Sequence, residues 1–252
     1  MRLRVGKGAF LEVEKVTVGH SQLWVRKDAR GRYWDIDVTR AILERDEYQL
    51  EPLIAENRRL RWVLDIGAHI GSFTLRVKRL WPGARVIAAE PDPDSAALFR
   101  RNTEGLDHVF LHEVAVLGSG SGGRAHLRQA GRVNRDRNAA ASWVAEAVDG
   151  LDRKANPPTL TVNCAGIVDL LDRHGRPTID LLKLDCEGAE GEILLALARV
   201  GHLERVNWIR GEWHFHQNIG RIEQALRQTH TFHIHQDRDP WGGFIAHRRM
   251  DG

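Results

Sequence analysis

Two short segments, far apart in the chain, contain the residue types that can do chemistry. Residues 63–73 read Val-Leu-Asp-Ile-Gly-Ala-His-Ile-Gly-Ser-Phe, and residues 179–190 read Ile-Asp-Leu-Leu-Lys-Leu-Asp-Cys-Glu-Gly-Ala-Glu. The first has the order of a buried strand, a glycine turn and a helix start, which in α/β proteins holds a nucleoside cofactor. The second is a buried strand with carboxylates at its carboxyl end, where such sheets carry out chemistry. Together they favour a cofactor-dependent transferase over a structural protein.

The glycine turn of the first segment indicates which cofactor it could hold. A dinucleotide-binding turn needs three spaced glycines, but His69 and Ser72 stand where its second and third glycines would be. Because a pyrophosphate needs bare backbone amides at the helix start, this departure argues against NAD. A cofactor without phosphate, such as S-adenosylmethionine, tolerates it. Glu90, at the end of the next predicted strand, could accept hydrogen bonds from both ribose hydroxyls.

If the cofactor is S-adenosylmethionine, the second segment must hold an acceptor and help to remove its proton. Asp185 stands at the carboxyl end of its strand, where the acceptor would lie. Lys183 shares that strand face, and burial of the pair is costly without mutual neutralisation, so we expect Lys183 to be structural. Glu187 and Glu190 fall where the strand passes into a helix, and the helix dipole would stabilise their charge.

A third polar group ends the following predicted strand, where residues 210–214 read Arg-Gly-Glu-Trp-His. Glu212 and His214 are two residues apart and so share a strand face. Next to Asp185 in a parallel sheet, they would form a general-base centre. His214 is the expected base because its unperturbed pKa lies near the operating pH. The same three residues could bind a divalent cation such as Mg²⁺, although the sequence favours catalysis without one.

A few residues outside these segments carry weaker signals. They are His230, His233 and His235 in a predicted late hairpin, Trp143 and Trp213, and Asn138 and Ser142 in a predicted loop. We expect the histidines to be solvated on an edge strand. The tryptophans could line an apolar acceptor pocket, and the loop residues could reach the cofactor carboxylate or the acceptor.

The predicted fold is an α/β doubly wound parallel sheet behind a small N-terminal cap. The cap, residues 1–58, should contain a hairpin of strands 22–25 and 33–37 with its turn at 28–31, then two short helices divided by Pro52. The second domain, 59–252, alternates strands and helices in the order that builds a parallel sheet. Its strands are expected at 62–66, 85–89, 109–116, 179–184 and 206–209, its helices at 72–81, 94–102, 167–171, 190–198 and 220–228, and a closing antiparallel pair at 232–235 and 243–246.

An insertion at about 118–161 interrupts the alternation. A glycine- and serine-rich connector at 118–123 opens it. Strands at 125–129 and 142–145 would flank the polar loop 132–140. The insertion could be a substrate lid or a plain surface excursion.

Composition narrows the classes of protein. The 252 residues suffice for one large α/β domain with a small appendage. Lys and Arg number 37 against 34 Asp and Glu, and the two signs alternate along most of the chain, which argues against a nucleic-acid partner. No apolar run approaches the roughly 20 residues that span a bilayer, so no membrane partner is expected. Cys164 and Cys186 lack zinc or disulfide spacing and fit a reduced, cytoplasmic protein. The sequence does not decide whether the protein forms a homo-oligomer.

Three blocks of the sequence resemble the FkbM family of S-adenosylmethionine-dependent methyltransferases, which are class I enzymes. They are residues 63–73, the triplet Ala89-Glu90-Pro91, and residues 179–190 with the pattern Lys-x-Asp-x-Glu-Gly-x-Glu, of which the last is specific to the family. The resemblance covers residues 59–215 and implies a seven-stranded Rossmann-like sheet and O-methylation of a hydroxyl, typically in natural-product biosynthesis. Where the family commonly has Asn, this chain has His69, so no role transfers to that side chain.

The sequence therefore predicts an S-adenosylmethionine-dependent O-methyltransferase acting on a hydroxyl of a small molecule, such as a natural product, polyketide or sugar. The expected cofactor contacts are Asp65, Gly67, Ala68, His69, Gly71, Glu90, Pro91, Ser142 and Asp185. The expected catalytic residues are Asp185, Glu212 and His214. Two alternatives stay open: an RNA or protein methyltransferase, which needs a basic or aromatic docking surface, and a non-catalytic module that binds the same cofactor. The clustered carboxylates argue against the module.

Overall fold

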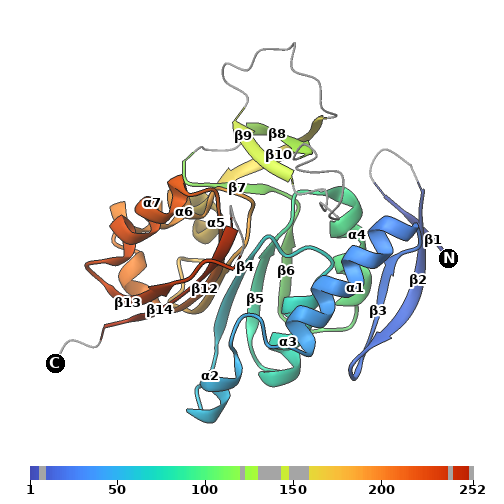
Figure 1. Cartoon of the computed structure of the whole chain (residues 1–252), viewed down its shortest axis with the longest axis horizontal. Coiled ribbons are helices and arrows are strands. Elements are labelled where there is room, and N and C mark those ends of the chain that lie inside the picture. The colour runs from blue at the N-terminus through green and yellow to red at the C-terminus, as the bar shows by residue number, and fades with distance from the viewer. Residues whose placement is uncertain (6–9, 120–122, 130–142, 148–158, 238–240, 250–252) are drawn as a thin grey trace. The chain divides into compact units, whose positions relative to one another are not determined.

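The computed structural model describes residues 1–5, 10–119, 123–129, 143–147, 159–237 and 241–249 (Figure 1). Its main sheet has seven strands in the order β13-β14-β12-β11-β4-β5-β6. The pairs β4–β5 and β5–β6 are parallel, whereas β14 is antiparallel to both β12 and β13. The predicted α/β fold and its closing antiparallel pair are thus confirmed. The chain divides into two compact units, residues 1–113 with 179–183, and residues 114–178 with 184–252.

The first unit contains the N-terminal cap and the parallel strands that lead to the glycine turn. Its elements are β1 (Arg2–Arg4), β2 (Phe10–Val18), β3 (Ser21–Arg26), α1 (Ala29–Leu43), α2 (Glu51–Ala55), β4 (Trp62–Ile66), α3 (Ser72–Leu80), β5 (Arg85–Ala89), α4 (Pro93–Asn102), β6 (Val109–His112) and nearly all of β11 (Ile179–Leu184). Strands β4, β5 and β11 begin and end where the sequence predicted. They are short apolar runs buried on both faces, which is typical of central parallel strands.

The predicted hairpin of the cap is wrong. Residues 33–37 belong to α1, which lies along β3 (Figure 1), and the hairpin is formed by β2 and β3 instead. Asp28 begins the helix by accepting a hydrogen bond from the backbone N–H of Gly31 at 2.8 Å. The buried positions Asp35, Thr39 and Ile42 have helical spacing. Because the first two are polar, a search for apolar periodicity misses them.

Two other predicted boundaries need correction. Pro52 does not divide a helical stretch, because it lies in the first turn of α2, where proline is tolerated. The predicted strand 109–116 is two strands. Its first part is β6 in the main sheet, and its second part, β7 (Ala115–Leu117), pairs with β10 (Thr159–Gly166) in another sheet.

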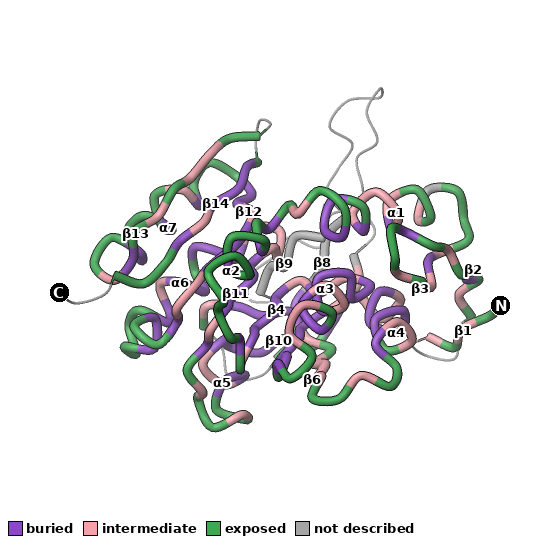
Figure 2. The backbone as a smooth tube through the Cα atoms, turned by 90° about the horizontal axis from the view of Figure 1, so that it is seen from below, coloured by how far each residue is buried: buried purple, intermediate pink, exposed green. Residues whose placement is uncertain are grey.

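The core of the first unit joins the cap to the glycine turn. Val13 and Val25 of the cap strands are fully buried in one cluster with Ile70 of the turn and Leu98 of α4. Figure 2 shows the buried stretches of α3 and α4 that face this core. Burying these apolar side chains contributes roughly 1.5–3 kcal/mol each, so the cap packs as part of this unit.

The second unit contains a four-stranded sheet in the order β7-β10-β8-β9 and the remaining elements of the main sheet. Beyond β7 and β10, its elements are β8 (Gly123–Gln129), β9 (Trp143–Ala147), α5 (Ile167–Asp172), α6 (Glu190–Arg199), a 3-10 helix (Leu203–Arg205), β12 (Val206–His214), α7 (Gln217–Leu226), β13 (His230–Ile234) and β14 (Trp241–Arg248). The two strands predicted in the insertion correspond to β8 and β9, whereas β10 was not predicted. The loop 132–140 lies outside the described residues, so the lid remains a prediction.

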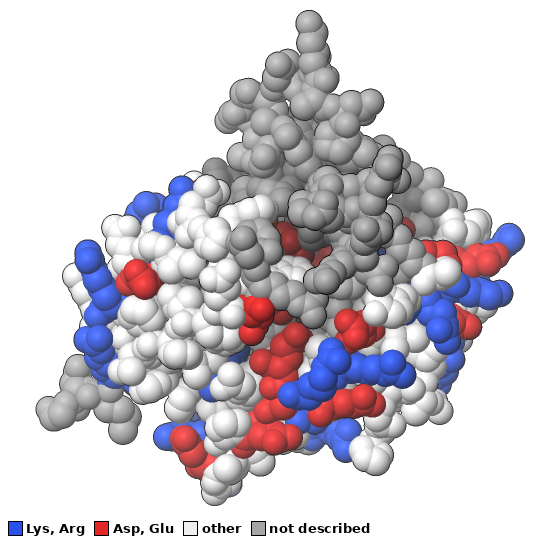
Figure 3. All heavy atoms as spheres, viewed as in Figure 1, with Lys and Arg blue, Asp and Glu red and all other residues white. Residues whose placement is uncertain are grey.

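The surface charge is mixed. Figure 3 shows Lys and Arg side chains lying beside Asp and Glu on the face drawn. In the part of the chain that the structure describes, no helix is long and apolar enough to cross a membrane.

Candidate functional site

The glycine turn after β4 is stabilised by its own backbone. Gly67, His69 and Gly71 have φ values of 81°, 49° and 94°, and a Cβ on Gly71 would lie 3.1 Å from Phe99 Cδ2. The N–H groups of Gly67 and Ala68 both donate to the carbonyl of Ala89 at 3.0 Å. These two amides are therefore occupied, whereas the predicted absence of a pyrophosphate site concerns the amides at the start of α3 and stays a prediction.

Asp65 lies beneath the turn. Its side chain is fully buried, accepts a hydrogen bond from Thr74 Oγ1 at 2.8 Å, and lies 3.6 Å from Lys183 Nζ. Lys183 in turn donates to the carbonyls of Gly67 at 2.5 Å and Ile66 at 3.4 Å. The predicted structural role of Lys183 thus involves Asp65 and the turn. Asp65 is placed to support the turn, and its predicted contact with the cofactor stays a prediction.

Glu90 follows β5 and is almost completely buried, with 7% of its surface exposed. Its Oε2 accepts a hydrogen bond from the backbone N–H of His69 at 2.8 Å, and its Oε1 accepts one from that of Asp92 at 2.9 Å. Burial and the nearby charge of Asp92 raise the pKa of Glu90 to about 6. Pro91 is half-buried beside it. The glycine turn and Glu90 were predicted to lie together, and within this unit they are in contact.

Two functional candidates in the cap were missed by the sequence argument. Asp35, with no exposed surface, lies 3.3 Å from His69 Nε2 and accepts hydrogen bonds from Arg26. Burial alone would raise the pKa of Asp35, but the hydrogen bond and charge of His69, together with Arg26, bring it below its usual range. The sequence carries no local signal for Asp35, because its burial depends on Arg26 and His69, which come from other segments.

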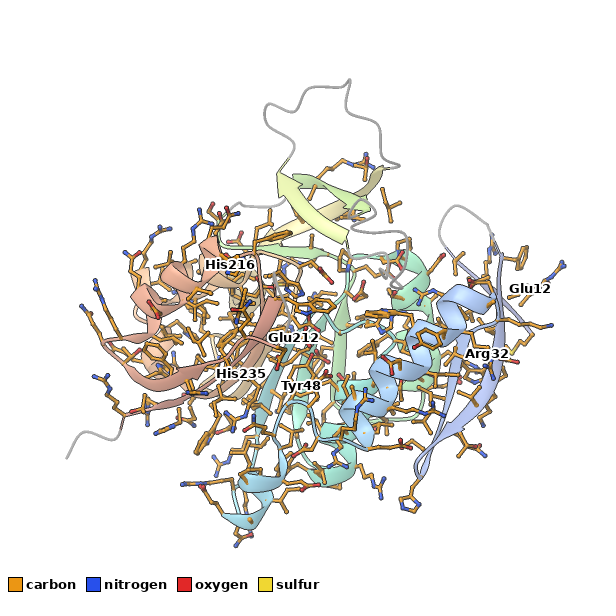
Figure 4. The ribbon with its side chains drawn as sticks, in the orientation of Figure 1. Glu12, Arg32, Tyr48, Glu212, His216 and His235 are labelled. Carbon is orange, nitrogen blue, oxygen red and sulfur yellow. The ribbon has the colours of Figure 1, made fainter. Side chains whose placement is uncertain are left out.

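The second unit places His214, at the end of β12, among carboxylates. Its Nδ1 lies 2.9 Å from Glu190 Oε1. Its Nε2 lies 3.6 Å from Glu187 Oε2 and 4.0 Å from the nearest oxygens of both Asp185 and Glu212. Figure 4 labels Glu212 on β12. The predicted group of Asp185, Glu212 and His214 is thus brought together within this unit.

The ionisation of His214 differs from the prediction. Burial would lower its pKa, but the charges of Glu187, Glu190 and Asp185 and the hydrogen bond to Glu190 raise the pKa to about 10. At neutral pH the imidazole therefore carries a proton, so that in this state it cannot be the general base. Its position was predicted correctly, whereas its unperturbed pKa was not a valid premise.

Glu190 was predicted only as an acid at a helix start. Its side chain is fully buried, and Oε1 accepts hydrogen bonds from the backbone N–H groups of Cys186 and Gly188, both at 3.1 Å. Asn218 Nδ2 lies 3.3 Å from the other oxygen. Glu190 therefore fixes the orientation of the His214 ring and the turn between β11 and α6.

A divalent cation is sterically compatible with this group. One ligand atom from each of Asp185, Glu212 and His214 lies within 4.8 Å of the others. Oxygen and imidazole ligands suit several divalent ions. For His214, a metal would have to displace the proton from Nε2, since metals bind neutral imidazole.

The structure describes some of the remaining predicted residues. Ser142 and Asn138 lie outside the described residues. Trp213 is fully buried and donates from Nε1 to the carbonyl of His235 at 3.0 Å, so it packs in the core and does not line an acceptor pocket. His230 is also buried, with Nε2 3.0 Å from the carbonyl of Val206, contrary to the prediction of a solvated histidine. The exposed His233 and the half-buried His235 have stacked rings.

Comparison with known proteins identifies the family. The model of the methyltransferase FkbM domain matches residues 65–234, and the chain belongs to this family. The match begins after the N-terminal cap, so the resemblance seen in the sequence is confirmed and the cap is left outside it.

Two curated relatives are each 28% identical to this chain over the aligned residues. The 2-O-methyltransferase NoeI of Sinorhizobium fredii is 28% identical over 52% of this chain and 55% of its own length. The methyltransferase sdnD of Sordaria araneosa is 28% identical over 75% of this chain and 82% of its own length. The match therefore spans about half of the first relative and most of the second.

Solved structures of similar fold are more distant. A 16S rRNA methyltransferase from T. thermophilus, in complex with AdoMet and guanosine, is 12% identical over 96% of this chain and 51% of its own, with a TM-score of 0.49. A precorrin-6y C5,15-methyltransferase from Geobacter metallireducens is 15% identical over 81% of this chain and 88% of its own, with a TM-score of 0.45.

Proposed function

We propose that this protein is an S-adenosylmethionine-dependent O-methyltransferase that acts on a hydroxyl of a small molecule. The observation that carries the proposal is Glu90, a buried carboxylate held by two backbone amides directly beside a glycine turn whose own amides are occupied. This arrangement suits a nucleoside without a pyrophosphate. Membership of the FkbM family supports methyl transfer, and the relative named as a 2-O-methyltransferase supports oxygen as the acceptor atom.

In this proposal the residues of the first unit bind the cofactor. Glu90 accepts hydrogen bonds from the ribose hydroxyls through lone pairs that the two amides leave available, since each carboxylate oxygen has two. Gly67, His69 and Gly71 shape the turn against which the nucleoside lies. Asp65 and Lys183 keep that turn in place from beneath.

The residues of the second unit handle the acceptor proton. As the methyl carbon leaves the sulfonium sulfur, it bonds to the acceptor oxygen, and the hydroxyl proton must pass to a base. Because His214 is protonated at neutral pH, we assign the base to a carboxylate of Asp185 or Glu212. The imidazolium holds these carboxylates in place and Glu190 holds the imidazolium. Thiols at Cys164 and Cys186 suit the proposed cytoplasmic location.

Calorimetric titration tests the cofactor directly. The full chain is titrated with S-adenosylmethionine and S-adenosylhomocysteine, with and without Mg²⁺, and with NAD as control. We expect both sulfur nucleosides to bind and NAD not to. Failure of both to bind, or a preference for NAD, would overturn the proposal. Binding would then justify a screen of hydroxylated acceptors, in which transfer to RNA or protein and not to small molecules would move the assignment to that class.

A further inference from the structure

The side chain of Arg26, at the end of β3, connects the cap with both segments that hold Glu90. One terminal nitrogen lies 2.5 Å from Asp35 Oδ1 and 3.4 Å from His69 Nε2. The other donates to Asp92 Oδ2 at 3.1 Å and Ser95 Oγ at 2.6 Å. The planar guanidinium presents its donors at fixed angles, so these contacts set the relative position of the two segments.

His69 and Asp92 are also the residues whose backbone N–H groups donate to the two carboxylate oxygens of Glu90. We propose that Arg26 is a positioning residue for the cofactor, which holds His69 and Asp92 so that their amides place the Glu90 carboxylate. This inference rests on the proposed function, in which Glu90 binds the ribose. It gives the cap, which lies outside the matched family domain, a role in cofactor binding.

The backbone of His69 needs such support. Its φ of 49° is in the left-handed region, which is unfavourable for a residue with a Cβ. The side chain is held at Nε2 by the fully buried Asp35 at 3.3 Å and by Arg26. This contact keeps the amide of His69 directed at Glu90. The left-handed conformation is therefore stabilised from the cap.

The first turn of α1 leaves room for the Arg26 side chain at Gly31. A Cβ on Gly31 would lie 2.5 Å from Arg26 Cδ, 2.7 Å from Oδ2 of the capping residue Asp28 and 2.9 Å from Arg26 Cβ. An alanine there would displace the arginine without removing its charge. Gly31→Ala thus offers a second way to disturb the contacts of Arg26.

The cap has other attachments that do not involve Arg26. Asn102 Nδ2 donates to the carbonyls of Trp24 at 3.0 Å and Ile70 at 2.8 Å, and the N–H of Trp24 donates to Asn102 Oδ1 at 2.6 Å. Together with the shared apolar core, these bonds keep the cap in place when Arg26 is changed. Variants of Arg26 are therefore expected to fold.

The test compares Arg26→Ala with Arg32→Ala in the full chain. Arg32, labelled in Figure 4, lies on α1. It pairs with Glu14 at the surface, so it is a matched control from the same cap. We expect Arg26→Ala to weaken S-adenosylhomocysteine about tenfold in calorimetry, because a charge-assisted hydrogen bond to the ligand is misplaced. Arg32→Ala should stay within about twofold of the wild type, as expected for an exposed ion pair.

A second ligand separates positioning from general loss of structure. The 2′,3′-dideoxy analogue of S-adenosylhomocysteine lacks the hydroxyls that Glu90 would bind. Arg26→Ala should weaken this analogue much less than the parent compound, whereas damage to the whole fold would weaken both equally. Arg26→Lys keeps the positive charge but loses the fixed donor geometry of the guanidinium, and it should give an intermediate affinity. If thermal unfolding shows that Arg26→Ala is not folded, Arg26→Lys and Gly31→Ala decide by the same comparison.

The outcomes distinguish this inference from the proposed function. If the wild type does not bind S-adenosylhomocysteine, the proposed function fails and the inference fails with it. If the wild type binds and the folded Arg26 variants bind equally well, only the inference is overturned. Equal weakening of both ligands would also overturn it.

Discussion

Buried carboxylates are held differently in the two units of this protein. In the first unit, Glu90 accepts hydrogen bonds from neutral backbone amides, and its pKa rises to about 6. In the second unit, Glu190 accepts amides and also contacts the His214 ring, whose pKa rises to about 10. The positive charge of the protonated His214 ring thus balances the negative charge of the carboxylates around it.

The two units therefore respond to pH in different ranges. The charge of Glu90 changes just below neutrality, whereas the charge of His214 is constant through the whole neutral range. The affinity for the cofactor should therefore fall in mildly acidic solution. His214, in the group that handles the acceptor, should stay protonated under the same conditions. A substitution in one unit should leave the function assigned to the other unit unchanged, so that the other unit serves as its control.

The largest effect is expected for His214→Ala. The substitution removes the cation that lies between Asp185, Glu187 and Glu212, and the acceptor proton loses an ordered base. Turnover with an identified acceptor should fall by up to the roughly 10²- to 10⁴-fold that a proton-transfer group contributes, because the carboxylate assigned as the base loses the cation that orders it. Calorimetric affinity for S-adenosylhomocysteine should stay unchanged. Unchanged turnover at saturating substrate would rule out a role for His214 in the reaction, provided thermal unfolding shows a folded variant.

The reciprocal change, Glu90→Ala, should affect binding. It removes two hydrogen bonds to a charged acceptor, which contribute roughly 1.5–3 kcal/mol each, so affinity for S-adenosylhomocysteine should fall at least about 100-fold. Glu104→Ala is the control, because that carboxylate is exposed and pairs with Arg101 on the surface. Equal affinities of the two variants would remove Glu90 from the cofactor site and leave the proposal without its main support.

Much of the fold could be predicted because its central strands are simple. Residues 62–66, 85–89 and 179–184 are apolar runs next to residues that break strands, and the structure has strands at the same bounds. The cap could not be read in this way. Helix α1 carries its buried face on Asp35 and Thr39, whose partners come from other segments. A polar residue is buried only because of those partners, which a local pattern does not contain.

The candidate site shows the same division. The positions of Glu90 and His214 were predictable because the ends of parallel strands collect functional groups. Their pKa values were not, since they depend on charges brought in by folding, such as Glu187 and Glu190 around His214. Arg26 was missed because its partners His69, Asp92 and Ser95 are far away in the sequence, at separations of 43, 66 and 69 residues.

The affinity for the cofactor should depend on pH through Glu90. If the ionised form of Glu90 accepts the ribose hydroxyls, affinity for S-adenosylhomocysteine should be constant above about pH 6 and fall as pH drops through the pKa of about 6. The slope should approach tenfold per pH unit, because one proton competes with the ligand. Glu90→Gln should bind more weakly and lose this dependence, while His214→Gln should retain it. A pH profile shared by the wild type and Glu90→Gln would show that another group titrates.

The smallest effect is expected on removal of divalent cations. His214 with a pKa of about 10 holds its proton at neutral pH, and a metal must displace that proton to bind Nε2. We therefore expect turnover measured in excess EDTA to stay within about twofold of that measured in Mg²⁺, since Mg²⁺ prefers oxygen ligands and keeps its waters. Loss of turnover in EDTA that Mg²⁺ restores would show the opposite, namely that a cation and not the imidazolium compensates Asp185 and Glu212. In that case Glu212→Gln should weaken the metal response more than Glu90→Gln does, because only Glu212 belongs to the possible ligand set.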